Sequence, residues 1–75
     1  MNNLSIDMAA TGANLRKIRR ERALSAVKVS ELVGLTSPQA VYRWERGETL
    51  PTMDNLVILA SVYHMTVDEI IVVKG

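Results

Sequence analysis

The stretch from Ser25 to Arg46 reads SAVKVSELVGLTSPQAVYRWER, and it decides the fold. Ser25 is a preferred N-cap residue, and the apolar pattern that follows it predicts a short helix over residues 26–33. The apolar positions at core spacing are Val29, Leu32 and Val33. Gly34 comes directly after the pattern, where a helix end often requires a positive φ. A helix of about two turns is unstable alone, so we expect it to dock on its neighbours.

A second helix follows in the same stretch. Ser37 is a suitable N-cap and Pro38 suits the first helical position, so we expect a helix from Pro38 to about Arg46 that ends at Gly47. Two short helices separated by a turn that contains glycine form a helix-turn-helix motif, here over residues 25–46.

Three further helices are predicted outside the motif. Each follows a Thr, which is an acceptable N-cap. They cover residues 13–22 after Thr11, 53–63 after Thr52, and about 67–71 after Thr66. His64 follows the second of these, where we expect the left-handed backbone conformation. The sequence therefore predicts an all-α domain of five helices.

The two ends of the chain have the pattern of strands. Leu4, Ile6 and Met8 alternate with polar residues, and residues 70–73 are a β-branched run. We expect the ends to pair as a short two-stranded ribbon; the alternative is a frayed N-terminal tail. The expected organisation is an N-terminal extension over 1–11, the helix-turn-helix domain over 12–71 and a C-terminal tail over 72–75.

Length and composition bound the possible functions. The chain has 75 residues, enough for one domain. It has no Cys, which excludes disulfides and thiolate zinc sites. No apolar run approaches the roughly 18 residues of a membrane span, and the start does not resemble a signal peptide. We therefore expect a cytoplasmic protein with no membrane partner.

The net charge of +1 conceals an uneven distribution. Residues 13–46 carry eight Arg and Lys against three Glu, a net of +5, whereas residues 47–75 carry one Lys against four acids, a net of −3. A basic half and an acidic half suggest one side that faces a polyanion. The alternative is an ordinary solvated surface of mixed charge.

Several of these residues together resemble the XRE/Cro-C1 family of helix-turn-helix regulators. The resemblance covers roughly residues 12–71. It is carried by Leu24-Ser25, Gly34, Val41, Trp44-Glu45-Arg46-Gly47, Pro51, Leu56, Leu59-Ala60 and Asp68-Glu69-Ile70. It implies a five-helix, repressor-like domain that binds operator DNA, with double-stranded DNA as its partner and no cofactor.

The resemblance also implies which side chains face the major groove. Counting back from Val41 places Ser37, Pro38 and Gln39 at the groove-facing start of the helix. Tyr42 and Arg43 lie one turn later on the same side, and Arg46 lies where family members contact the DNA backbone. The Gln39 amide suits a bidentate contact with adenine, and the alternative is a solvated side chain. Arg43 suits guanine or, more commonly for basic residues, a phosphate. Tyr42 is either a contact to the sugar-phosphate wall or a half-buried surface aromatic.

The chain departs from the family pattern at two places. Ala26 stands where family members usually carry Gln, so the DNA contact of that Gln is expected to be absent. The turn, with Leu35-Thr36-Ser37, is one residue longer than usual.

The family pattern further implies a structural ion pair between Arg19 and Glu45, which joins the first helix to the end of the third. Ile58 and Val62 form an apolar pair at a position that the family usually leaves polar. We expect this pair to be covered in part by the chain ends around Leu4 and Ile6, and in part by a second subunit of a homodimer.

An enzymatic function is not expected. The sequence has no glycine-rich phosphate loop, no metal-ligand spacing and no nucleophile–base pair. The predicted function is sequence-specific regulation of transcription. The alternatives are a protein-interaction module on the same fold, which does not bind a specific operator, and nonspecific nucleic-acid binding with a steep salt dependence.

Overall fold

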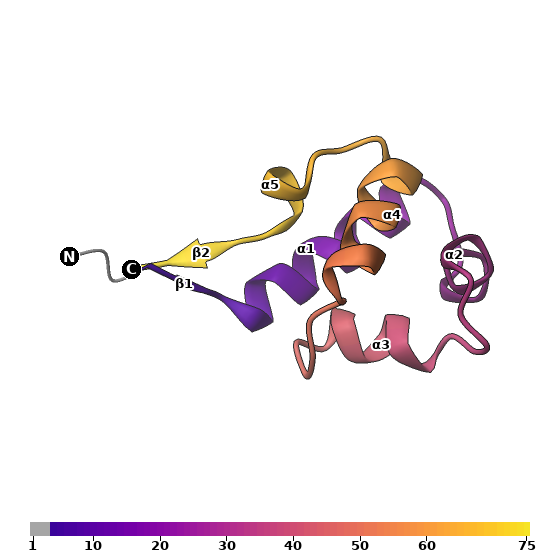
Figure 1. Cartoon of the computed structure of the whole chain (residues 1–75), viewed down its shortest axis with the longest axis horizontal. Helices are drawn as coiled ribbons and strands as arrows, with labels where there is room; N and C mark the ends of the chain where they lie inside the picture. Colours follow the sequence, from indigo (N-terminus) through magenta and orange to yellow (C-terminus); the bar gives the residue numbers. More distant parts are fainter. Residues whose placement is uncertain (1–3) are drawn as a thin grey trace.

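The computed structural model describes residues 4–75, which fold into five helices and one two-stranded antiparallel sheet (Figure 1). In chain order the elements are β1 (Ser5–Ile6), α1 (Met8–Glu21), α2 (Ala26–Val33), α3 (Gln39–Glu45), α4 (Met53–Tyr63), α5 (Val67–Ile70) and β2 (Val73–Lys74). The predicted class, five helices with a terminal ribbon, is confirmed. Within the described part of the chain, no helix has the length and apolar character needed to cross a membrane.

The helices are held together by one core to which all five contribute. Its buried apolar residues are Leu15, Ile18, Ala26, Val29, Val33, Val41, Trp44, Leu56, Leu59, Ala60, Tyr63 and Ile70. Leu32 was predicted to belong to this set but is 46% exposed. The buried stripe of α2 contains Ser30 on the inner side instead, with its hydroxyl donating to the carbonyl of Val27 at 2.6 Å.

The start of α1 also differs from the prediction. The helix begins at Met8, and its N-cap is Asp7, whose carboxylate accepts a hydrogen bond from the Ala10 amide at 3.0 Å. Thr11, the predicted cap, lies inside the helix and is fully buried. Its hydroxyl accepts from the amide of Val72 at 2.9 Å and donates to the carbonyl of the same residue at 3.3 Å. Thr11 therefore anchors the C-terminal segment rather than beginning the helix.

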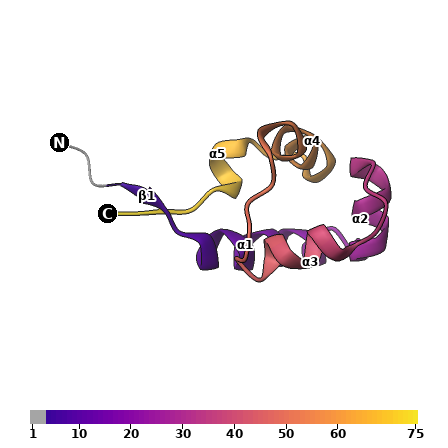
Figure 2. The ribbon, with the colours of Figure 1, turned by 60° about the horizontal axis from the view of Figure 1, so that its bottom comes forward.

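The terminal ribbon continues from this anchor. Ser5 lies opposite Lys74 and Ile6 opposite Val73. In both views the ribbon extends from the start of α1, away from α4 (Figures 1 and 2). Leu4 and Ile6 are 58% and 40% exposed, so the predicted cover of α4 by the chain ends is wrong.

The other helix ends follow the sequence closely. Ser25, Thr52 and Thr66 each accept a hydrogen bond from the backbone amide three residues later, as N-caps do. Gly34 and His64 have φ of 90° and 55° and end α2 and α4 in the left-handed conformation. The expectation for His64 is confirmed. The left-handed residues Gly34 and His64 set the direction of the segments that lead into α3 and α5.

Tyr63 is expected to make the domain sensitive to alkali. Its side chain lies in the core, and burial, with a smaller effect from Glu45, raises its pKa from 10.0 to about 12. The folded pKa exceeds the unfolded one, so this stabilisation is complete below pH 10 and is lost as the pH rises through 12. We expect the free energy of unfolding, measured with urea and Trp44 fluorescence, to fall across this window. In Tyr63→Phe most of that fall should disappear; an undiminished fall would refute the assignment.

Candidate nucleic-acid interface

The helix-turn-helix motif lies on one side of the domain. Figure 2 shows α1 and α3 running together along this side, with α4 and α5 on the other. α3 packs against both α1 and α2, and the remainder of its surface is open to solvent. The motif therefore presents α3 as an outer ridge, which is the arrangement required for insertion into a groove.

Apolar and polar residues occupy opposite faces of α3. Val41 and Trp44 are 1% and 6% exposed and fix the rotation of the helix against the core. The residues exposed on the outer side are Gln39, Tyr42, Arg43 and Arg46. Their spacing of three, four and seven residues from Gln39 places them on one helix face. We call these four residues the α3 outer face; all of them were expected from the sequence to face DNA.

The beginning of α3 lies one residue later than predicted. Gln39 is the first helical residue, and Pro38 occupies the N-cap position without a side-chain cap. Pro38 has ψ of 0°, which is outside the helical range. The hydroxyl of Ser37 is 3.5 Å from the Gln39 amide, at the limit of a hydrogen bond. The expected strong cap at Ser37 is therefore wrong, because the longer turn is still bending at Pro38.

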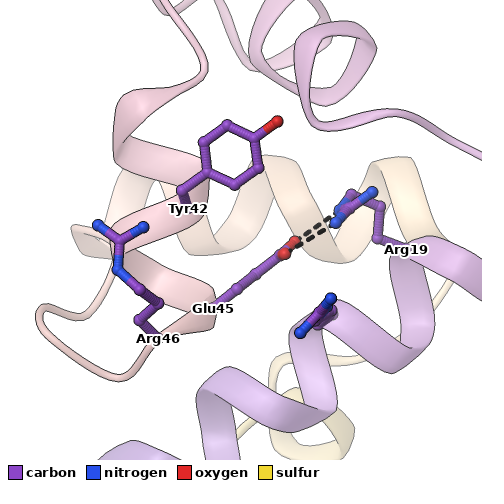
Figure 3. A pocket seen from close by; sticks show the side chains of 5 residues that line it. Arg19, Tyr42, Glu45 and Arg46 are labelled. Carbon is purple, nitrogen blue, oxygen red and sulfur yellow. Dashed lines mark hydrogen bonds and ion pairs between the residues drawn. The ribbon is translucent and has the colours of Figure 1, made fainter.

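Arg19 and Glu45 connect α1 to the end of α3 (Figure 3). Nε and Nη2 of Arg19 donate to the two carboxylate oxygens of Glu45 at 2.7 and 2.9 Å. Nη1 donates to the carbonyl of Leu24 at 3.1 Å. The two side chains are only 12% and 6% exposed, and the hydrogen bond to Glu45 raises the pKa of Arg19. The guanidinium of Arg19 and the carboxylate of Glu45 thus form a bidentate ion pair that is largely shielded from water.

Arg46 has a partner that the sequence analysis missed. Its guanidinium Nε donates to a carboxylate oxygen of Glu48, just beyond the end of α3. The hydrogen bond from Arg46 lowers the pKa of Glu48, so the carboxylate is charged at neutral pH. Both side chains are about half exposed. An external anion that binds Arg46 therefore competes with Glu48.

Gly12 sets how closely α1 approaches α3. A Cβ added at this position would lie 2.6 Å from the carbonyl oxygens of Trp44 and Glu45. Both obstacles are backbone atoms, which cannot rotate away as a side chain can. The sequence analysis placed Gly12 before the helix and did not identify this contact, because only the three-dimensional packing shows it.

The apolar surface of α4 is larger than the sequence suggested. Ile58 is 37% exposed and Val62 is partly buried against the core. Met53 and Val57 are 67% and 55% exposed on the same helix. At about 3.6 residues per turn these four side chains spread over about half of the helix circumference, with Met53 and Val62 on opposite flanks and Val57 and Ile58 between them. Together they are called the α4 apolar face below.

Comparison with known proteins places these features in context. A helix-turn-helix family model matches residues 15–70 of the chain. Comparison with curated proteins gave no match. Among solved structures, the chain is similar to the restriction-modification controller protein C.AhdI from Aeromonas hydrophila, with 28% identity over 85% of this chain and 96% of that one and a TM-score of 0.78.

Two other solved structures are also similar. The P22 c2 repressor protein, solved in complex with a synthetic operator, is 28% identical over 80% of this chain and 89% of that one, with a TM-score of 0.76. The clp gene regulator ClgR from Corynebacterium glutamicum is 22% identical over 84% of this chain and 66% of that one, with a TM-score of 0.76. At that identity the likeness to ClgR concerns the fold alone.

Proposed function

The chain belongs to the helix-turn-helix family of the XRE/Cro-C1 type, and from this premise we propose that it regulates transcription by inserting α3 into the major groove of a specific operator. One observation carries the proposal. The α3 outer face gathers the polar and basic side chains of the helix on its solvent side, whereas Val41 and Trp44 hold the opposite side in the core. The P22 c2 repressor, which is similar in fold, was solved on an operator.

Gln39 and Arg43 are proposed to distinguish the bases. Gln39 is in the first turn of α3, and the first turn enters the groove in this docking geometry. Its amide can donate to N7 and accept from N6 of adenine. Arg43 lies one turn later on the same face and has no carboxylate within ion-pair distance among residues 4–75, so its guanidinium is available for guanine or a phosphate.

The remaining residues are proposed to position the helix. Tyr42 and Arg46 suit the sugar-phosphate backbone, through a hydroxyl and an ionic contact respectively. Ser37 offers its hydroxyl to the same backbone. Pro38 has no donor and offers an apolar contact, such as one to a thymine methyl group.

The α4 apolar face is proposed to hold a second copy of this chain. Three of its four side chains are exposed, Val62 being partly buried, and the terminal ribbon lies away from it. A symmetric pair would place two copies of α3 on two half-sites of an operator, which compensates for the small contact area of one 75-residue module. The same exposed face also favours the rival function, a protein-interaction module without an operator.

Replacing Gln39 and Arg43 together by Ala separates the two functions. If they contact bases, affinity for the preferred duplex should fall at least about tenfold, since each bidentate contact contributes about 1–3 kcal/mol. The melting temperature should not change, because both side chains are exposed. Lys74→Ala, which removes an exposed cation on the ribbon, is the charge-matched control and should bind normally. Equal affinity in the double variant and the wild type would overturn the base-reading roles.

A further inference from the structure

A basic groove runs between α1 and α3 beside the α3 outer face. It consists of two adjoining hollows that share Arg16 and Glu45. The first, of about 240 Å³, is also lined by Arg19, Tyr42 and Arg46, and the second by Ala13, Lys17, Arg20 and Glu21 (Figure 3 shows the first). The groove holds guanidinium groups from two helices within reach of a single ligand.

The carboxylates in the groove do not neutralise these groups. Glu45 is occupied by the bidentate contact with Arg19, and Glu21 lies near Lys17 and Arg22, at 3.9 and 3.8 Å. Arg16 and Arg20 have no carboxylate within ion-pair distance in the described residues. They are exposed on α1 at a spacing of four residues, where like charges destabilise a helix. An anion placed between them would remove this repulsion.

We propose that the α1–α3 groove binds backbone phosphates of DNA, with Arg16 and Arg20 as the principal contacts. This inference rests on the function proposed above. Tyr42 and Arg46 belong to both the groove and the α3 outer face, so a strand bordering the major groove passes directly over it. Arg16 and Arg20 are about 6 Å apart along the helix axis, so a polymer with neighbouring phosphates engages both and adds contacts along its strand that a free phosphate ion lacks.

The contact is electrostatic and does not depend on base sequence. Each phosphate that a protein neutralises releases counterions and makes the affinity fall more steeply with salt, by about 0.9 in the slope of log K against log salt concentration. The groove therefore extends the DNA contact beyond the α3 outer face and adds affinity without changing which sequence is preferred.

The test compares Arg16→Gln, Arg20→Gln and the double variant with the wild type on one preferred duplex, over a range of salt concentrations. Because the operator is proposed to bind two copies, each single variant removes two phosphate contacts and should reduce the magnitude of the salt slope by about 1.8, and the double by about 3.6, with the base preference unchanged. Lys74→Gln is the matched control and should leave the slope unchanged. The melting temperature should stay equal or rise, since a like-charge pair has been removed.

The outcomes separate this inference from the proposed function. If the salt slope is unchanged in the double variant while the wild type still binds selectively, phosphate binding by the groove is wrong but the proposed function stands. A double variant that changes the base preference also overturns it, because the contact would then be to bases. A wild type without selective DNA binding overturns the proposed function and this inference together. Titration with inorganic phosphate, followed by the NMR signals of the Arg16 and Arg20 side chains, should show no saturable site; tight saturation would assign the groove to a small anion instead.

Discussion

Arg19→Ala is expected to lower the free energy of unfolding by about 3–5 kcal/mol, because it leaves the charge of Glu45 buried without its partner. The Glu45 side chain is only 6% exposed, so its carboxylate remains poorly hydrated after losing two hydrogen bonds. The carbonyl of Leu24 loses its bond from the same guanidinium. A domain of this size has only about 5–15 kcal/mol of stability, and the melting temperature should fall by more than about 10 °C. DNA binding should then be lost as the domain unfolds.

The control removes both charges. Arg19→Met combined with Glu45→Leu should recover much of the lost stability, because a buried ion pair replaced by apolar side chains is often close to neutral. Thermal unfolding followed by circular dichroism measures both variants. If Arg19→Ala keeps the wild-type melting temperature but does not bind DNA, the residue acts at the DNA surface and its structural assignment is wrong.

Gly12→Ala is expected to be destabilising, by about 1–3 kcal/mol, as for other overpacked sites. Intrinsic helix propensity predicts the opposite, since Ala is better than Gly inside a helix by about 1 kcal/mol. Packing should prevail here because the added Cβ would lie 2.6 Å from two backbone carbonyl oxygens of α3. α1 and α3 must then separate, which also strains the pair between Arg19 and Glu45.

Urea unfolding of Gly12→Ala gives the measurement, with Lys17→Ala on the exposed side of α1 as its control. The control should differ from the wild type by no more than about 0.5 kcal/mol, as surface substitutions usually do. A Gly12→Ala variant as stable as the wild type, or more stable, would mean that the close approach of the two helices is not required.

Much of the fold could be predicted because the helix ends carry local chemistry. Ser25, Thr52 and Thr66 cap their helices, and Gly34 and His64 end theirs in the left-handed conformation. These signals act within four residues and can be read without knowledge of the tertiary structure. The antiparallel pairing of the chain ends was also predicted, from the alternating and β-branched patterns.

The errors arose where a residue had two suitable partners. Thr11 is an acceptable N-cap, although a weaker one than Asp7, and its contact with Val72, 61 positions away, shows which role it takes. Leu32 was placed in the core by its apolar spacing relative to Val29 and Val33, whereas the buried stripe of α2 includes Ser30. In each case tertiary packing decided between local alternatives.

In the candidate site, too, local sequence signals predicted some features, whereas others depended on tertiary packing. The α3 outer face could be predicted because Val41 and Trp44 fix the rotation of the helix, and the other residues follow from its period. The positions of Ser37 and Pro38 relative to the start of α3 could not be predicted, because the turn is longer than the one in the family pattern. The groove beside α1 and the contact of Arg46 with Glu48 depend on how the helices meet and on side-chain conformation.

The most direct test of the central claim, specific operator binding through α3, is selection of bound duplexes from a random DNA pool at one fixed salt concentration. The wild-type protein should enrich a sequence with two inverted half-sites, centred about one helical turn or roughly 34 Å apart, as expected for a dimer. The variant with Gln39 and Arg43 replaced by Ala should lose that enrichment. A wild-type pool that stays as random as the starting DNA would contradict the claim.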